Sequence, residues 1–170
     1  MHAFAKLVEQ CVAFNLAAVE RAEANLVDAL QASGAKRLVA ALQVIRLQKA
    51  VVAVGLFAMF DASLQGCLAV RDGFRAADDR LVRLGEVALR QRFLDFQSAI
   101  NVLKHGRGAS YDRLVARAGA LPFRIRLPDE AAFDEGDVSE PEVLIDVDDA
   151  FLRACACVIR EVSDTLVRAA

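Results

Sequence analysis

The residues of this sequence best suited to chemistry gather in one stretch, from Arg90 to Arg117. Within it, Asn101 and His105 are four residues apart, so both would lie on one face of a helix. A histidine has a reference pKa of about 6.5 and can accept or donate a proton at neutral pH. We therefore take His105 and Asn101 as the candidate catalytic residues, with Asn101 orienting the histidine or a ribose hydroxyl.

Cationic and hydrogen-bonding side chains surround this pair, and such groups can hold a phosphate and stabilise the charge that develops on it. The candidate phosphate- or RNA-binding residues are Lys104, Arg107, Tyr111 and Arg113. The chain has only two histidines, and its four cysteines lack CxxC spacing, so we expect no metal site and no cofactor. The chemistry that fits these residues is metal-independent cleavage of RNA, with the 2′-hydroxyl as nucleophile.

The same residues also have a purely structural interpretation. Lys and His in the last turn of a helix complement its dipole, and a following glycine such as Gly106 suits a left-handed cap. Ser110 would then cap the next helix, and Tyr111 would pack against the core. The sequence leaves both interpretations open.

The segment Asn101-Val-Leu-Lys-His105 and the all-helical pattern resemble the HEPN superfamily of small helical-bundle proteins. Its members typically bear a polar residue and a histidine in an R-x(4–6)-H motif near the end of one bundle helix, and many are dimeric RNases. The resemblance implies RNA binding or cleavage centred on His105. The chain departs from the motif, because Asn101 stands where the family's arginine is expected and Arg92 is too far upstream. Loss of that arginine implies a fold that can persist without nuclease activity.

Apolar periodicity predicts the elements that would position this site. Helices are expected over residues 3–32, 36–70, 77–104 and 148–167, with a short one from Ser110 to about Ala118. The core stripe expected for the first helix is Leu7, Cys11, Phe14, Ala18, Ala22, Leu26 and Leu30. The stripe expected for the third is Val82, Gly85, Leu89, Phe93, Phe96, Ile100 and Leu103.

Residues 123–127 and 143–147 alternate between apolar and polar side chains as strands do. The sequence therefore predicts a single domain over residues 1–170. Its fold is a mainly α, antiparallel four-helix bundle with a short extra helix. A small two-stranded β insert, within about residues 122–147, precedes the last helix.

The second expected helix is the one candidate for a membrane span. Its window from residue 50 to residue 70 carries one charge, Asp61, which opposes insertion by about 3 kcal/mol. Residues 50–60 are apolar all round, so we expect a core helix buried on most sides and no membrane partner. A seam of small residues at four-residue spacing would let a neighbouring backbone approach closely: Ala58, Ala62 and Gly66, with Gly55 nearby.

Charge is sorted along the chain, although its net value is only −2. Residues 80–126 carry ten Arg or Lys against three acids, whereas residues 127–150 carry ten acids and no base. The acidic run has three interpretations: a solvated loop, a segment that docks on the basic region, or a divalent-ion loop without the EF-hand pattern.

Two functions from different classes follow. Apolar residues make up 56% of the chain, which exceeds the usual level and favours a subunit interface. With no evident signal peptide, we expect a cytoplasmic protein. We expect a non-catalytic helical-bundle interaction or regulatory module that acts as a homodimer or with a protein partner. The alternative is a HEPN-like RNA-binding protein or metal-independent endoribonuclease of a toxin–antitoxin or defence system, centred on His105.

Overall fold

The computed structural model describes residues 1–30, 35–130 and 144–169, with the side chains of all of these except 25–30, 35–40 and 42. The described chain is mainly helical, as the sequence predicts. Its helices are α1 (His2–Leu30), α2 (Ala35–Leu68), α3 (Gly73–Arg83), α4 (Val87–His105), α5 (Ala109–Val115) and α6 (Asp149–Arg168), and a 3-10 turn spans Ala118–Ala120.

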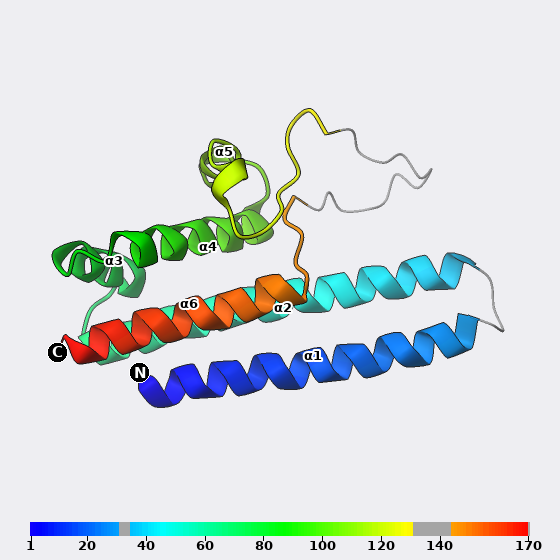
Figure 1. Ribbon diagram of the computed structural model, residues 1–170, viewed down its shortest axis with the longest axis horizontal. Helices are drawn as coiled ribbons and strands as arrows, with labels where there is room; N and C mark the ends of the chain where they lie inside the picture. Colours follow the sequence, from blue (N-terminus) through cyan, green and yellow to red (C-terminus); the bar gives the residue numbers. More distant parts are fainter. Residues whose placement is uncertain (31–34, 131–143, 170) are drawn as a thin grey trace.

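The four long helices form an antiparallel bundle (Figure 1). α1 packs against α2 and α6, and α4 packs against the same two helices from the other side. The short α3 lies between the end of α2 and the start of α4, and α5 covers the outer side of α4. The helical bundle predicted from apolar periodicity is therefore confirmed.

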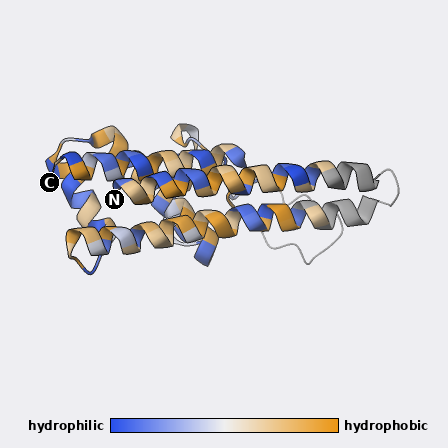
Figure 2. Cartoon of the chain, turned by 90° about the horizontal axis from the view of Figure 1, so that it is seen from below, coloured by the Kyte–Doolittle hydropathy of each residue, from blue (hydrophilic) through white to orange (hydrophobic). Residues whose placement is uncertain are grey.

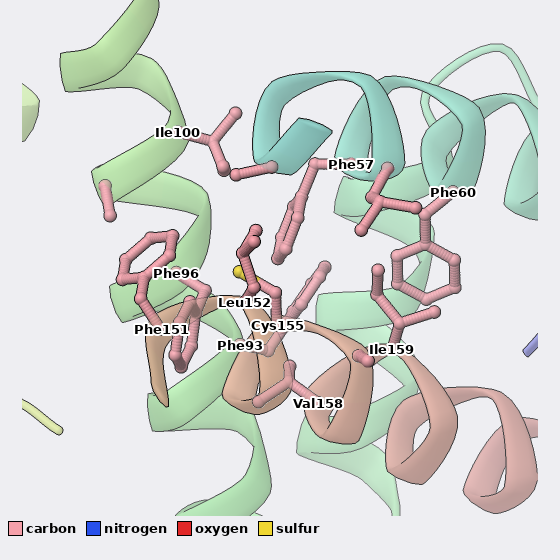
Figure 3. Close-up of a cluster of buried hydrophobic side chains, with 14 of the residues drawn as sticks. Phe57, Phe60, Phe93, Phe96, Ile100, Phe151, Leu152, Cys155, Val158 and Ile159 are labelled. Atoms are coloured by element: carbon pink, nitrogen blue, oxygen red, sulfur yellow. The ribbon is translucent and has the colours of Figure 1, made fainter. Parts of the chain in front are cut away.

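Phenylalanine rings form the centre of this bundle (Figure 3). Phe74 of α3 meets Phe93 of α4 with 5.5 Å between ring centroids, and Phe96 of α4 meets Phe151 of α6 at 5.2 Å. Phe57 of α2 stacks on Phe96 at 6.5 Å. Such pairs contribute about 0.5–1.5 kcal/mol each beyond the burial of their area. The rings thus bind α2, α3, α4 and α6 into one core.

The third predicted helix is wrong as a single element, because the chain breaks it into α3 and α4. Gly85 lies in the break with φ of 72°, a conformation that glycine adopts without strain. Gly85 and Val82, both placed in the predicted core stripe, are exposed. The first of the two helices begins earlier than predicted because the Asp72 carboxylate accepts a hydrogen bond from the Arg75 N–H at 3.0 Å.

The predicted core stripe of α1 is also wrong. Leu7 and Phe14 are 62% and 70% exposed, and Cys11 and Ala22 lie outside the core as well. Leu26 and Leu30 lie outside the described side chains. The buried face is formed instead by Ala5, Val8, Val12, Leu16 and Val19. α1 carries two apolar stripes at helical spacing, and the stripe from Ala5 to Val19 faces the core.

The predicted two-stranded β insert is not found in the described residues. They contain one isolated antiparallel bridge, between Ile125 and Ile145, both of which are buried. The Arg126 N–H donates to the Leu144 carbonyl at 3.0 Å, and no strand extends beyond the bridge. Most of the acidic run, including the suggested divalent-ion residues Asp134, Glu135, Asp137 and Glu140, lies outside the described residues.

The junction between α2 and α3 is the tightest backbone approach at a described glycine. The Asp61 carboxylate accepts hydrogen bonds from the Phe74 N–H at 3.1 Å and from the Gln65 side chain at 2.7 Å. A Cβ at Gly73 would lie 2.6 Å from the Asp61 carbonyl oxygen and 2.7 Å from the Leu64 Cβ. The turn into α3 therefore needs glycine at position 73.

We expect Gly73→Ala to lower the free energy of unfolding by about 1–3 kcal/mol, because backbone and core atoms must move to admit the methyl group. Urea denaturation monitored by circular dichroism measures this change. Gly119→Ala is the matched control, since nothing lies within 4 Å of a Cβ there. Equal stability of Gly73→Ala and the wild type would contradict the close approach at Asp61.

Candidate functional site

His105 lies in the last turn of α4, where Gly106 ends the helix with φ of 75° and its N–H donates to the Val102 carbonyl at 2.8 Å. The His105 and Lys104 side chains are exposed. Among the described residues, neither forms a hydrogen bond or an ion pair. The histidine lies away from the core, as its distance from the apolar stripe predicted, and it is accessible to a ligand.

Asn101 is half-buried and lines a pocket of about 200 Å³ between α2 and α4. Lys104 and Gln97 line the same pocket from α4, and Asp61 lines it from α2. His105 is not among the lining residues. The structure thus brings Asn101 and Lys104 together and places His105 on the neighbouring surface.

The remaining candidates attach α5 to the bundle. Tyr111 is 3% exposed, and its hydroxyl donates to the Arg126 carbonyl at 2.7 Å. The Arg107 guanidinium lies 5.3 Å from the centre of the Tyr111 ring, and Arg113 donates to the Ser98 hydroxyl at 3.3 Å. A tyrosine buried in this way has no free face on which a nucleotide base could stack.

Sequence reasoning missed the main polar contact of this region, which joins Asp95 to Arg117. The Asp95 side chain is buried in α4, and its two oxygens accept hydrogen bonds from Arg117 at 3.0 and 3.1 Å. Gln91 donates a third hydrogen bond at 3.0 Å. The signal in the sequence was a single acid between two core phenylalanines, Phe93 and Phe96.

Arg92, the nearest upstream arginine, takes no part in the His105 region. It lies 13 residues away along α4, about 20 Å at the rise of an α-helix. There it donates to both carboxylate oxygens of Glu161 on α6. Burial alone would raise the pKa of Glu161, but the hydrogen bonds from Arg92 and Cys157 outweigh burial and lower that pKa.

Arg92 and Glu161 border an open pocket of about 680 Å³ where α1, α4 and α6 meet. The arginines of this pocket are already engaged, since Arg160 pairs with Glu9 at 3.0 Å and Arg168 donates to Thr165 at 3.3 Å. An anion would have to displace these contacts. The contacts of the side chains that line this pocket therefore stabilise the fold, and none of these arginines could bind an anion without losing a contact.

The expectation that residues 50–60 of α2 are buried on most sides holds only in part. Ala53, Leu56, Phe57 and Phe60 are buried, whereas Val51 and Met59 are each 62% exposed. By length and composition this helix could cross a membrane, and it is the one such helix among the described residues. Among the described residues, a Cβ built on Gly55 or Gly66 meets nothing within 4 Å, so neither glycine is required by a close neighbour there.

Exposed apolar residues of α1 and α2 share one side of the molecule. On α1, Glu9 and His2 face α6, where Glu9 pairs with Arg160 and His2 bonds Asp164 at 2.9 Å. The exposed stripe lies on the other flank of α1, beside α2, because it is about 130° around the helix from the buried stripe. Figure 2 shows the two helices side by side with hydrophobic residues along both.

We call this surface the α1–α2 face. It consists of Leu7, Cys11 and Phe14 of α1 and Val44, Leu47, Val51, Ala58, Met59, Ala62 and Gly66 of α2, all of which are exposed. Gly55 lies half-buried at the middle of the α2 part.

Comparisons with protein-family models, with curated proteins and with solved structures find no match to this chain. Its function is therefore inferred from its own residues.

We expect Asp95→Ala to lower the free energy of unfolding by about 2–3 kcal/mol. Loss of one partner of a buried ion pair costs about 3–5 kcal/mol, and Arg117 can recover part of this through solvent. Thermal or urea denaturation measures the change. Arg124→Ala is the control, because its pair with Glu130 spans 3.7 Å at the surface and contributes at most about 1 kcal/mol. Equal losses in the two variants would contradict the structural role of Asp95.

Proposed function

We propose that this protein is a non-catalytic helical-bundle interaction module that associates, with itself or with a protein partner, through the α1–α2 face. One observation carries the proposal: six large apolar side chains of α1 and α2 are 62–70% exposed. They are Leu7, Phe14, Val44, Leu47, Val51 and Met59.

The size of the exposed surface supports association. At these exposures the six side chains present on the order of 800 Å², which exceeds the largest apolar patch of a typical monomer, about 300–600 Å². A specific interface buries about 800 Å² on each partner. The apolar surplus noted in the sequence is therefore located where a partner can cover it.

The groups around α2 favour a protein partner over a bilayer. Its opposite face carries the core rings, and two of its charged residues bind within the bundle: Lys49 pairs with Asp149 at 2.7 Å, and Asp61 accepts a hydrogen bond from the Phe74 N–H of α3. Helices that lie in a membrane surface usually carry Lys or Arg on their polar face. Among the described side chains of α2, the polar residues beside the exposed stripe are Gln43 and Gln48, and the exposed Arg46 lies about 140° around the helix from Val51.

The cysteines fit a reducing, cytoplasmic location, which forms part of the proposal. All four are free thiols, and Cys11 and Cys67 are exposed. Burial raises the pKa of the Cys155 thiol well above its ordinary value, so this thiol is unreactive at neutral pH.

We expect the wild-type chain to scatter light with at least twice its mass of 18.4 kDa, and the double variant Phe14→Glu, Val51→Glu to be monomeric. Burying two carboxylates without partners in an apolar interface is strongly unfavourable. Light scattering coupled to size exclusion measures the mass, and circular dichroism confirms that the monomer is folded.

Val87→Glu is the matched control, because Val87 is 76% exposed at the start of α4, outside the α1–α2 face. It should associate as the wild type does. A monomeric wild type would exclude self-association, and equal dissociation of both variants would exclude this surface.

The alternative, RNA binding or cleavage, is favoured by one observation: His105 and Lys104 are exposed and form no hydrogen bond or ion pair among the described residues. If it holds, purified protein cleaves labelled total RNA in excess chelator, and His105→Ala abolishes cleavage because the proton-transfer group is lost. His2→Ala is the control, since His2 is an exposed histidine far from the end of α4. Intact RNA with the wild type, at concentrations where it is associated, would rule out the nuclease.

A further inference from the structure

We propose that the partner on the α1–α2 face is a second copy of this chain, and that the two α2 helices pair antiparallel about a twofold axis near Gly55. The inference rests on the proposed function, because it requires association through that face. It adds the identity of the partner, the direction of the helices and the register between them.

Most residues of the α2 part of the α1–α2 face lie on one straight line. Six exposed residues and the half-buried Gly55 follow one another at steps of three, four and four residues, repeated twice: Val44, Leu47, Val51, Gly55, Ala58, Ala62 and Gly66. This 11-residue repeat averages about 3.67 residues per turn, so the stripe drifts little around the helix. A second straight helix can contact the whole of it.

Side-chain size changes along this line. Along this line the half before Gly55 carries large residues, Val44, Leu47 and Val51, and the half after it carries small ones, with Met59 of the same face beside the line. Parallel pairing would set large residues against large ones and leave a gap between the small halves. Antiparallel pairing centred on Gly55 sets the large half of each copy into the small half of the other. The stripe is therefore complementary to itself under a twofold rotation, as a C2 interface requires.

The glycines of α2 support a close approach of the two backbones. Glycine within a helix costs about 1 kcal/mol relative to alanine, and small residues are used where backbones must come close. Among the described residues nothing lies within 4 Å of a Cβ built on Gly55 or Gly66, so packing within the described chain does not require glycine at these positions. Gly73, in contrast, is required by contacts inside the fold. Close approach of a second α2 helix would explain why glycine occupies positions 55 and 66.

The same axis is central to the exposed stripe of α1. Phe4 stacks on Phe60, and Glu23 lies 3.9 Å from Lys49. Midway between these two contacts, residues 13 and 14 of α1 are level with residues 54 and 55 of α2. A twofold axis at Gly55 therefore passes between Leu7 and Ala18, and it places the α1 stripe of one copy over the α1 stripe of the other.

A swap of side-chain sizes tests the register. In the proposed dimer, Leu47 of one copy lies beside Ala62 of the other. We expect Ala62→Leu to raise the dissociation constant about tenfold to a hundredfold, because two symmetric sites are overfilled. Mixing Ala62→Leu chains with Leu47→Ala chains should restore a heterodimer close to wild-type affinity. Positions 47 and 62 of one chain are about 22 Å apart along α2, so the rescue must act between chains.

The direction of the helices is tested by a distance between spin labels. The exposed native Cys67 is labelled in the variant Cys11→Ser, Cys157→Ser. Cys67 lies 12 residues beyond Gly55, so antiparallel pairing places the two labelled positions about 36 Å apart along the axis. Parallel pairing would leave almost no separation along the axis and a much shorter label distance, because equivalent residues then lie side by side on helices about 8–10 Å apart.

The outcomes separate this inference from the proposed function. A dimer that Phe14→Glu, Val51→Glu disrupts, but with a short label distance or no rescue by the swap, overturns the antiparallel register and leaves the interaction surface intact. A wild type that remains monomeric overturns the second copy as partner. If that monomer floats with vesicles of phosphatidylcholine and phosphatidylglycerol, the face binds lipid and both proposals fail.

Discussion

The packing of α2 against the phenylalanine core constrains the rest of the structure. Phe57 and Phe60 face inward and meet the rings of α3 and α4. With α1 on one flank and α4 on the other, a bundle of this size covers only part of α2. Because the helix is apolar on nearly all sides, the orientation that buries the rings also exposes Val51 and Met59. The exposed face is thus a direct consequence of how the core forms.

The orientation of α1 depends on weaker contacts. Its two apolar stripes are similar in size, so burial alone discriminates little between them. Glu9 and His2 meet Arg160 and Asp164 of α6 only in the observed orientation. Surface ion pairs contribute about 0–1 kcal/mol each. Such small contributions can decide the rotation of a helix when the hydrophobic gains of its two orientations are nearly equal, and here they leave Leu7 and Phe14 exposed beside α2.

These features explain what the sequence could and could not predict. Periodicity located the long helices and placed His105 away from the core, because apolar residues at three- and four-residue steps fit few structures other than an amphipathic helix. It could not choose between two stripes on α1, where both fit the same pattern. It also extended one helix through Gly85, since a glycine at a core position and a glycine at a break look alike in sequence. The alternation around Ile125 and Ile145 predicted two strands, but the described residues form only a single bridge there.

The stretch from Arg90 to Arg117 is rich in polar residues, and most of them serve the fold. Asp95, Ser98, Arg113, Arg117 and Tyr111 bond one another or the backbone and fix α5 to α4. An active site needs groups that remain available to a substrate, and of the candidate site residues Lys104, His105 and the half-buried Asn101 have no such contact among the described residues. The α1–α2 face, in contrast, consists of residues for which the described chain provides no packing role. The exposed apolar residues without a packing role therefore lie on α1 and α2, and for this reason association is the better-supported function.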